Sequence, residues 1–281
     1  MNKLKILAVG VSALALGSPL TAATDGQSAT VPVAAAVASF YDSLHTQPIW
    51  FRGGANTAAI AQLTAILQRA PLDGFPEGPQ LAAQVQAAAA QAASGNQSDV
   101  NNAERILSTA WVQYVQAIKK PTTGMIYAYP VLEPQGDRAD QILLTTAAAP
   151  SLADYLASVS DVNAIYKQLR DTAWSEAQAS GNLTPDPRLL ANLDRVRSLP
   201  AKGRFLLVDS GSSMLTLYQD GQPIDSMKVI TGMEQLPTPL IASYVLHHLQ
   251  SVLACARPSR AQDDRAQFPC RRNEVSEVAR L

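Results

Sequence analysis

The chain has 281 residues and a formal net charge of −1 at pH 7. This length can hold one large or two modest domains, and the near-neutral charge carries no signature of nucleic-acid or membrane-surface binding. Its two cysteines, Cys255 and Cys270, both lie near the C-terminus, so a framework of several disulfides is excluded. Neither has metal-ligating neighbours at zinc-like spacing, and we expect no metal and no other cofactor.

Residues 1–23 have the pattern of a secretory signal peptide. Lys3 and Lys5 give a charged start, residues 6–16 are apolar, and small residues at 21–23 suit cleavage. The apolar run is shorter than the roughly 20 residues that span a bilayer. We therefore expect export to the periplasm rather than a membrane anchor, and no transmembrane segment after the signal is removed.

Residues 36–200 are expected to be all-helical, because apolar residues recur there at helical spacing between glycine and proline breaks. A proline-interrupted loop is expected at residues 121–136. Seven helices are expected. The first holds Phe40 and Tyr41, the second begins at Asn56 or Thr57, and the third covers 79–93. The fourth begins at Asn101, the fifth at Ser151, and the last two cover 161–179 and 187–196.

The helix expected at Asn101 carries the clearest pattern of this region. Glu104 follows Asn101 by three residues, which resembles a capping box at a helix start. Further along, apolar and aromatic residues recur at spacings of four, three and four, and form one stripe: Leu107, Trp111, Tyr114 and Ile118. A core-facing stripe is favoured over a ligand-stacking role.

Residues 203–244 have the pattern of short strands. β-Branched and aromatic residues cluster in short blocks separated by glycine-containing turns, and Asp220-Gly221 between two blocks predicts a hairpin. The sequence thus predicts an α+β chain, with a helical domain at 36–200 followed by a few strands.

The strand region resembles the start of the catalytic domain of L,D-transpeptidases, which cross-link bacterial peptidoglycan through a cysteine nucleophile. The resemblance lies in Val208-Asp209, Leu215 to Tyr218, Asp220 to Pro223, Met227 to Val229 with Gly232, and Thr238 to Ser243. It implies acyl transfer from a tetrapeptide stem and peptidoglycan stem peptides as partners. The family's Ser-His-Gly-Cys-x-Arg nucleophile motif does not occur in these 281 residues.

The helical region is similar to the scaffold domain that precedes this catalytic domain in the larger periplasmic members. The similarity rests on Phe40-Tyr41 with Pro48-Ile49-Trp50, Asp73-Gly74-Phe75, Ala103 to Ser108, and Arg188 to Pro200. It implies a scaffold domain at 36–200 and the start of an incomplete all-β catalytic domain at 201–245.

After Tyr244 the strand pattern is lost. Family members usually continue here as Tyr-Tyr-Ile-Thr-Phe-Asn-Pro-Tyr-Trp-His-Val-Pro-Asp-His-Leu-Val-Arg-Lys-Thr-Ile-Ala. Codons for that peptide, read from the third base onward, give Leu246 to Arg265 residue for residue. The hypothesis is a frameshift near Tyr244, which makes residues 246–281 an out-of-frame, disordered tail.

The reactive-looking residues are weighed against this hypothesis. His247, His248 and Cys255 could suggest a Cys-His pair or a metal site, but adjacent histidines on a strand face opposite ways. His45 lies beside an apolar anchor, and a structural role is favoured. The polar residues after the first strand are interpreted as turn residues: Asp209, Ser210, Ser212 and Ser213. No catalytic residue and no metal ligand is assigned, and substrate-binding residues stay unassigned.

Two functions remain open. The first is a homologue of peptidoglycan L,D-transpeptidases that is inactive in this form. The second is a non-catalytic periplasmic scaffold that binds peptidoglycan or a partner protein. A transpeptidase domain closes its sheet with strands that come after Tyr244, so in the incomplete domain apolar faces and strand edges from Phe205 to Tyr244 are expected to be open.

Overall fold

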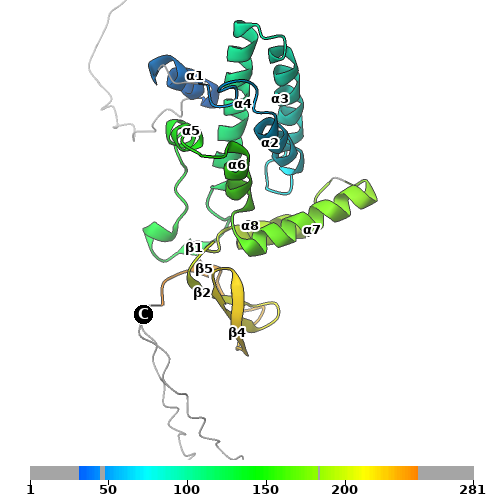
Figure 1. Ribbon diagram of the computed structural model, residues 1–281. Coiled ribbons are helices and arrows are strands. Elements are labelled where there is room, and N and C mark those ends of the chain that lie inside the picture. The colour runs from blue at the N-terminus through cyan, green and yellow to red at the C-terminus, as the bar shows by residue number, and fades with distance from the viewer. Residues whose placement is uncertain (1–31, 45–47, 183, 246–281) are drawn as a thin grey trace, which may run out of the picture. The chain divides into compact units, whose positions relative to one another are not determined.

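The computed structural model describes residues 32–44, 48–182 and 184–245 (Figure 1). The chain divides into two units, Met1–Ser243 and Tyr244–Leu281. The expected signal peptide, the expected tail, His45 and all residues from 246 onward, including His247, His248 and Cys255, lie outside the described residues. Within the first unit, helices followed by strands confirm the predicted α+β class.

The described residues form eight α-helices, one short 3₁₀ helix and five strands. The helices are α1 (Val33–Leu44), α2 (Thr57–Arg69), α3 (Gly78–Ala92), α4 (Gln97–Ile118), α5 (Ala139–Ala147), α6 (Leu152–Asp161), α7 (Ala164–Ser180), α8 (Pro187–Arg197) and η1 (Pro130–Leu132). The strands are β1 (Ile126–Tyr127), β2 (Arg204–Asp209), β3 (Met214–Gln219), β4 (Gln222–Lys228) and β5 (Ile241–Ala242).

Two predicted helix starts are confirmed by their caps. The side chain of Asn56 accepts a hydrogen bond from the backbone N–H of Ala59 at 3.1 Å, and α2 follows. Ser151 accepts from the N–H of Asp154 at 3.4 Å at the start of α6. Such side chains satisfy backbone donors that the first helical turn leaves free.

Two other predicted starts are wrong. Helix α4 begins at Gln97, because Asn96 has an extended backbone and accepts from the N–H of Ser98 at 3.0 Å. Asn101 therefore lies inside the helix, and Glu104 completes no capping box. Likewise α7 begins after Asn163, while Asp161 ends α6 and Val162 breaks the helix with φ of 54°.

The expectation of an all-helical region over 36–200 needs one correction. The loop after α4 contains β1, which pairs in parallel with β5 through Ile126↔Ile241 and Tyr127↔Ala242. A two-residue strand has no periodicity of its own, and its partner lies more than a hundred residues away. Helix α5 was also not expected, although it lies within the helical region.

The apolar stripe on α4 is confirmed as a core face. Leu107, Trp111 and Tyr114 are fully buried, and Ile118 is nearly so. Helix α4 packs mainly on α3, and α3 also packs on α2. The aromatic anchor of the N-terminal segment, Trp50, is fully buried in the same core.

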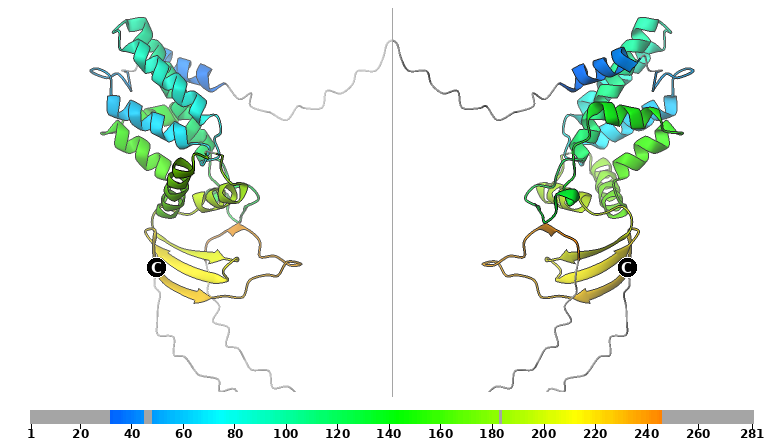
Figure 2. Two further views of the ribbon diagram at one scale, coloured as in Figure 1. Left: turned by 90° about the vertical axis from the view of Figure 1, so that its right-hand side faces the viewer. Right: turned by 90° about the vertical axis from the view of Figure 1, so that its left-hand side faces the viewer.

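Strands β2, β3 and β4, which follow α8, form an antiparallel sheet in the order β2-β3-β4 (Figure 2), whereas β5 pairs with β1. The predicted hairpin is confirmed: Asp220 and Gly221 connect β3 to β4 with φ of 50° and 78°. Two successive positive φ values define the turn that fits the twist of adjacent strands. Leu217 pairs with Asp225 and the next residue, Tyr218, pairs with Pro223, so Ile224 is an extra residue that forms a bulge in β4.

Among the described residues, no helix has the length and apolar character needed to cross a membrane.

Candidate functional site

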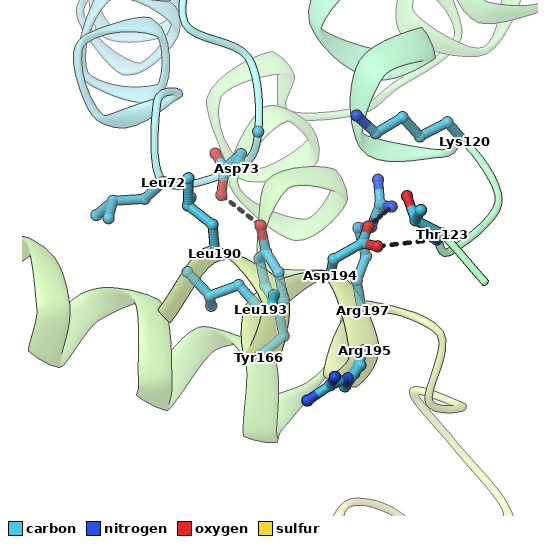
Figure 3. A pocket seen from close by; sticks show the side chains of 12 residues that line it. Leu72, Asp73, Lys120, Thr123, Tyr166, Leu190, Leu193, Asp194, Arg195 and Arg197 are labelled. Atoms are coloured by element: carbon cyan, nitrogen blue, oxygen red, sulfur yellow. Dashed lines mark hydrogen bonds and ion pairs between the residues drawn. The ribbon is translucent and has the colours of Figure 1, made fainter. Parts of the chain in front are cut away.

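A pocket of about 390 Å³ lies among the helices of the first unit (Figure 3). Its lining comes from the turn after α2, the loop after α4, and helices α7 and α8. The residues are Leu72, Asp73, Gly74, Lys120, Thr123, Tyr166, Leu190, Ala191, Leu193, Asp194, Arg195 and Arg197. Four segments far apart in the sequence therefore build one cavity.

The floor of the pocket holds a buried carboxylate, Asp73, with only 5% of its surface exposed. The Tyr166 hydroxyl donates to one oxygen at 2.5 Å, and the Tyr114 hydroxyl donates to the other at 2.8 Å. Figure 3 shows Tyr166 pointing at Asp73. Burial raises the pKa of Asp73, because a carboxylate loses hydration, while Arg170 and the two hydroxyls oppose the rise.

A fully buried guanidinium, Arg170, lies behind this floor and over the ring of Tyr166 at 5.6 Å. It donates to the carbonyl of Ser160 at 2.5 Å and to carboxylates of Asp161 and Asp171, each at 2.8 Å. Burial works against its charge, yet Asp73 and these acceptors outweigh it and raise the pKa of Arg170. The guanidinium is thus bound by these partners, and Arg170 does not line the pocket.

The wall from α8 is joined to the end of α4 by Asp194 and Arg197. Arg197 donates to the last carbonyls of α4, Ala117 and Ile118, both at 3.0 Å, and also pairs with Asp194. The other carboxylate oxygen of Asp194 accepts from the N–H of Thr123 at 2.9 Å. Arg197 therefore satisfies helix-end carbonyls that lack intrahelical donors.

Two cationic side chains, Lys120 and Arg195, are the exposed charges of this lining. Arg195 contacts Asn192 at 3.2 Å, a neutral partner. The lining contains no cysteine, histidine or serine. The pocket therefore offers positive charge, apolar walls and buried oxygens for binding, and no nucleophile with a neighbouring base for catalysis.

A second buried carboxylate, Glu104 on α4, holds the N-terminal segment in place. It accepts from the backbone N–H of Ile49 and from that of Trp50 at 3.1 Å, and from the hydroxyl of Tyr41 at 3.0 Å. Ser108, one turn on, accepts from the indole N–H of Trp50 at 2.9 Å. Burial raises the pKa of Glu104, and this cluster has a structural role.

No site residue is assigned from the sequence, and the polar residues after β2 are interpreted as turn residues: Asp209, Ser210, Ser212 and Ser213. Asp209 accepts from the N–H of Gly211 at 2.9 Å and from the hydroxyl of Ser212 at 2.5 Å, which fits the interpretation of a turn. None of these residues lines the pocket. No cluster able to hold a metal ion occurs in the part of the chain that the structure describes.

Sequence reasoning missed the pocket residues Asp73 and Tyr166 and their neighbour Arg170. One signal was available: Arg170 follows Tyr166 by four residues on α7, so the two side chains lie on the same face of the helix. A charged residue on a partly apolar helix face indicates that the charge has a partner nearby. Asp73 gives no such signal, because it lies in a turn where aspartate is common.

Fold and pocket together define a helical module with a ligand-sized cavity, followed by a small antiparallel sheet. The sequence profile of the family described as Scaffold domain, the N-terminal domain of L,D-transpeptidases, matches residues 35–172. A Haemophilus influenzae protein named "Putative L,D-transpeptidase" is 24% identical over 136 residues, which cover 47% of this chain and 28% of that protein. No solved structure matches the chain.

Both findings support a relationship to the L,D-transpeptidases. The chain matches well under half the length of the Haemophilus relative. The profile match lies entirely within the helical part. The matched residues 35–172 include the Glu104 cluster, Asp73 and the first half of α7.

Proposed function

We propose that this chain is a homologue of the peptidoglycan L,D-transpeptidases that carries the helical scaffold domain and is inactive in this form. The observation that carries the proposal is the match of the Scaffold domain profile to residues 35–172. The transpeptidase-like strand motif after α8 has the position expected of the start of a catalytic domain. The proposed setting is the periplasm, after removal of a signal peptide at 1–23, with peptidoglycan stem peptides as partners.

Inactivity is proposed from the sequence that follows Tyr244. A cysteine transpeptidase needs a thiolate activated by a neighbouring base in a shaped site. Neither Cys255 nor Cys270 stands in a Ser-His-Gly-Cys run. The match of Leu246 to Arg265 with a shifted reading of the family peptide supports a frameshift as the origin of this tail.

Labelling with a carbapenem tests activity, because an active-site cysteine of these enzymes would be acylated. Intact-mass measurement of this chain beside an intact transpeptidase should show an adduct on the enzyme alone. A Cys255→Ser/Cys270→Ser double variant separates acylation from adventitious thiol reaction. An adduct on the unaltered chain, absent from the double variant, would refute inactivity.

Sequencing the gene across the codons for Ser243 to Arg265 and beyond tests the frameshift. If another frame continues into the family peptide and reaches codons for Ser-His-Gly-Cys, the frameshift holds. If no frame does so, the tail is native, and the result favours the second function, a non-catalytic binding module.

The second function, a non-catalytic binding module for peptidoglycan or a partner protein, is favoured by the pocket. Lys120 and Arg195 place exposed positive charge beside apolar walls, which suits a peptide with free carboxylates. Isothermal titration with soluble peptidoglycan stem peptides should give binding that Lys120→Gln and Arg195→Gln weaken. Lys119→Gln is the matched control, because Lys119 pairs with Asp137 and does not line the pocket.

A further inference from the structure

One face of the sheet β2-β3-β4 is apolar and open. Residues paired across neighbouring strands share a face, and alternate residues of a strand lie on the same side. The register therefore assigns to this surface, called here the open face, the side chains of Arg204, Leu206, Val208, Leu215, Leu217, Gln219, Gln222, Asp225 and Met227.

The exposure of the open face is high for apolar side chains in a sheet. Leu206 is 44% exposed, Val208 46% and Met227 57%. The strands make their extensive contacts with one another. Leu206 lies beside Leu217, and Val208 beside Leu215, which in turn lies beside Met227, so the apolar side chains form contiguous rows. Sheets of this kind normally bury one face against a second layer.

The two charges of the open face have opposite signs and lie on opposite edge strands. Arg204 is on β2, where its guanidinium donates to the neutral side chain of Gln219 at 3.1 Å. Asp225 is on β4, where it accepts from the backbone N–H of Ser226 at 2.7 Å. Neither forms an ion pair within the described ranges 32–44, 48–182 and 184–245.

We propose that the open face binds the open face of a second copy of this chain. A half turn about an axis parallel to β3 places β2 of each copy over β4 of the other. The apolar rows of the two sheets then face each other at about 10 Å, the spacing of packed sheets. The same rotation brings the Arg204 edge of each copy to the Asp225 edge of its partner, twice by symmetry.

This arrangement explains why a self-complementary occupant suits the surface. The apolar centre needs an apolar partner, and the charges of opposite sign on its two edges need the reverse order on the partner. A second copy turned in this way supplies both. The inference rests on the sheet alone and stands whether or not the proposed function holds.

Sedimentation equilibrium of the full chain over a range of concentrations tests the proposal. The unaltered chain should dimerise. Arg204→Glu alone and Asp225→Arg alone should each raise the dimer dissociation constant by about tenfold, because each sets like charges against each other. The double variant Arg204→Glu/Asp225→Arg should restore the dissociation constant, because it exchanges the charges without changing the apolar rows.

The controls separate this contact from other associations. Val131→Gln removes a 77% exposed apolar side chain outside the sheet and should leave dimerisation unchanged. Leu206→Thr/Val208→Thr should abolish the dimer while strand-forming residues are kept, and circular dichroism checks that each variant is folded. A chain that stays monomeric overturns the proposal. So does a dimer that the charge exchange fails to rescue, as expected for pairing through the free edge of β2 or for binding by the tail.

Discussion

The single residues that matter most in this chain are two carboxyl groups buried by the helices. Asp73 and Glu104 are 5% and 4% exposed, and each has several donors and raised pKa. Each donor buried with them would be left unsatisfied if the carboxyl were lost, at about 1–3 kcal/mol for a buried group. Both carboxyl groups connect segments that are distant in the sequence. Asp73 binds side chains of α4 and α7, and Glu104 binds α1 and the segment at Trp50.

Glu104→Ala should lower the free energy of unfolding by about 2–4 kcal/mol, because the backbone N–H groups of Ile49 and Trp50 lose their acceptor and the hydroxyl of Tyr41 keeps only its bond to Ser108. Glu104→Gln keeps one carbonyl oxygen and should lose less. Urea unfolding measures both variants, and Glu77→Ala, an exposed glutamate, is the matched control. Equal losses for Ala and Gln would contradict the role of the acceptor oxygens.

The raised pKa of Asp73 predicts a particular pH dependence. The folded chain binds this proton more tightly than the unfolded chain, so the contribution of Asp73 to stability is full below the ordinary carboxyl pKa of about 4. It is lost as pH rises through the raised folded-state pKa. Urea midpoints of the unaltered chain relative to Asp73→Asn should therefore fall as pH rises from 4 to 8. Parallel pH profiles for the two proteins would show that Asp73 does not titrate differently on folding.

At the scale of elements, the pairing of β1 with β5 joins the loop after α4 to the end of the strand region. The N–H of Ile126 donates to the carbonyl of Leu240, and the N–H of Ala128 donates to that of Ala242, both at 2.9 Å. The loop itself is fixed on α8, where Thr122 donates to the carbonyl of Asp194 at 2.7 Å. Two short segments thus depend on contacts made elsewhere in the chain.

Ile126→Pro should break this pairing, because proline has no N–H to donate to Leu240. We expect the amide of Ala128 to exchange with deuterium about tenfold faster or more, as local opening becomes easier. Ile126→Ala keeps the donor and, since Ile126 is 55% exposed, loses little packing. Hydrogen exchange of the three proteins compares them directly, and identical rates would mean that β1 and β5 do not pair in solution.

At the scale of the whole molecule, the described residues differ sharply in how well apolar side chains are covered. The helices bury one continuous core that includes Trp50, Trp111 and Leu156. In contrast, β4 is exposed along its whole length, and Ile230, Met233 and Leu236 are 103%, 67% and 75% exposed. The earlier expectation of open apolar faces and edges in the strand region is confirmed by these exposures.

Limited proteolysis should therefore cut first between residues 201 and 281 and leave a helical fragment that ends near Pro200. Segments with few buried apolar contacts open at low cost, and cleavage follows that opening. Mass spectrometry of the products over time gives the order of the cuts. Early cuts inside α2 to α4, with residues 201–281 spared, would overturn this expectation.

The sequence predicted the elements whose signals are local. The stripe on α4, the caps Asn56 and Ser151 and the turn at Asp220-Gly221 all depend on residues within a few positions of one another. The same local reasoning misassigned Glu104, because a glutamate three residues after asparagine has the pattern of a capping box whatever its side chain contacts in space.

Only the tertiary structure decided the pocket and the two buried acids. Asp73 and Tyr166 are separated by 93 residues, and Glu104 and Trp50 by 54. The sequence identifies a carboxyl group in a turn or on a helix as polar. Whether it is buried, and which donors satisfy it there, depends on segments that packing brings together. The sequence by itself thus determined most of the helices, the hairpin and the resemblance to a family, while helix packing decided which polar groups line a cavity.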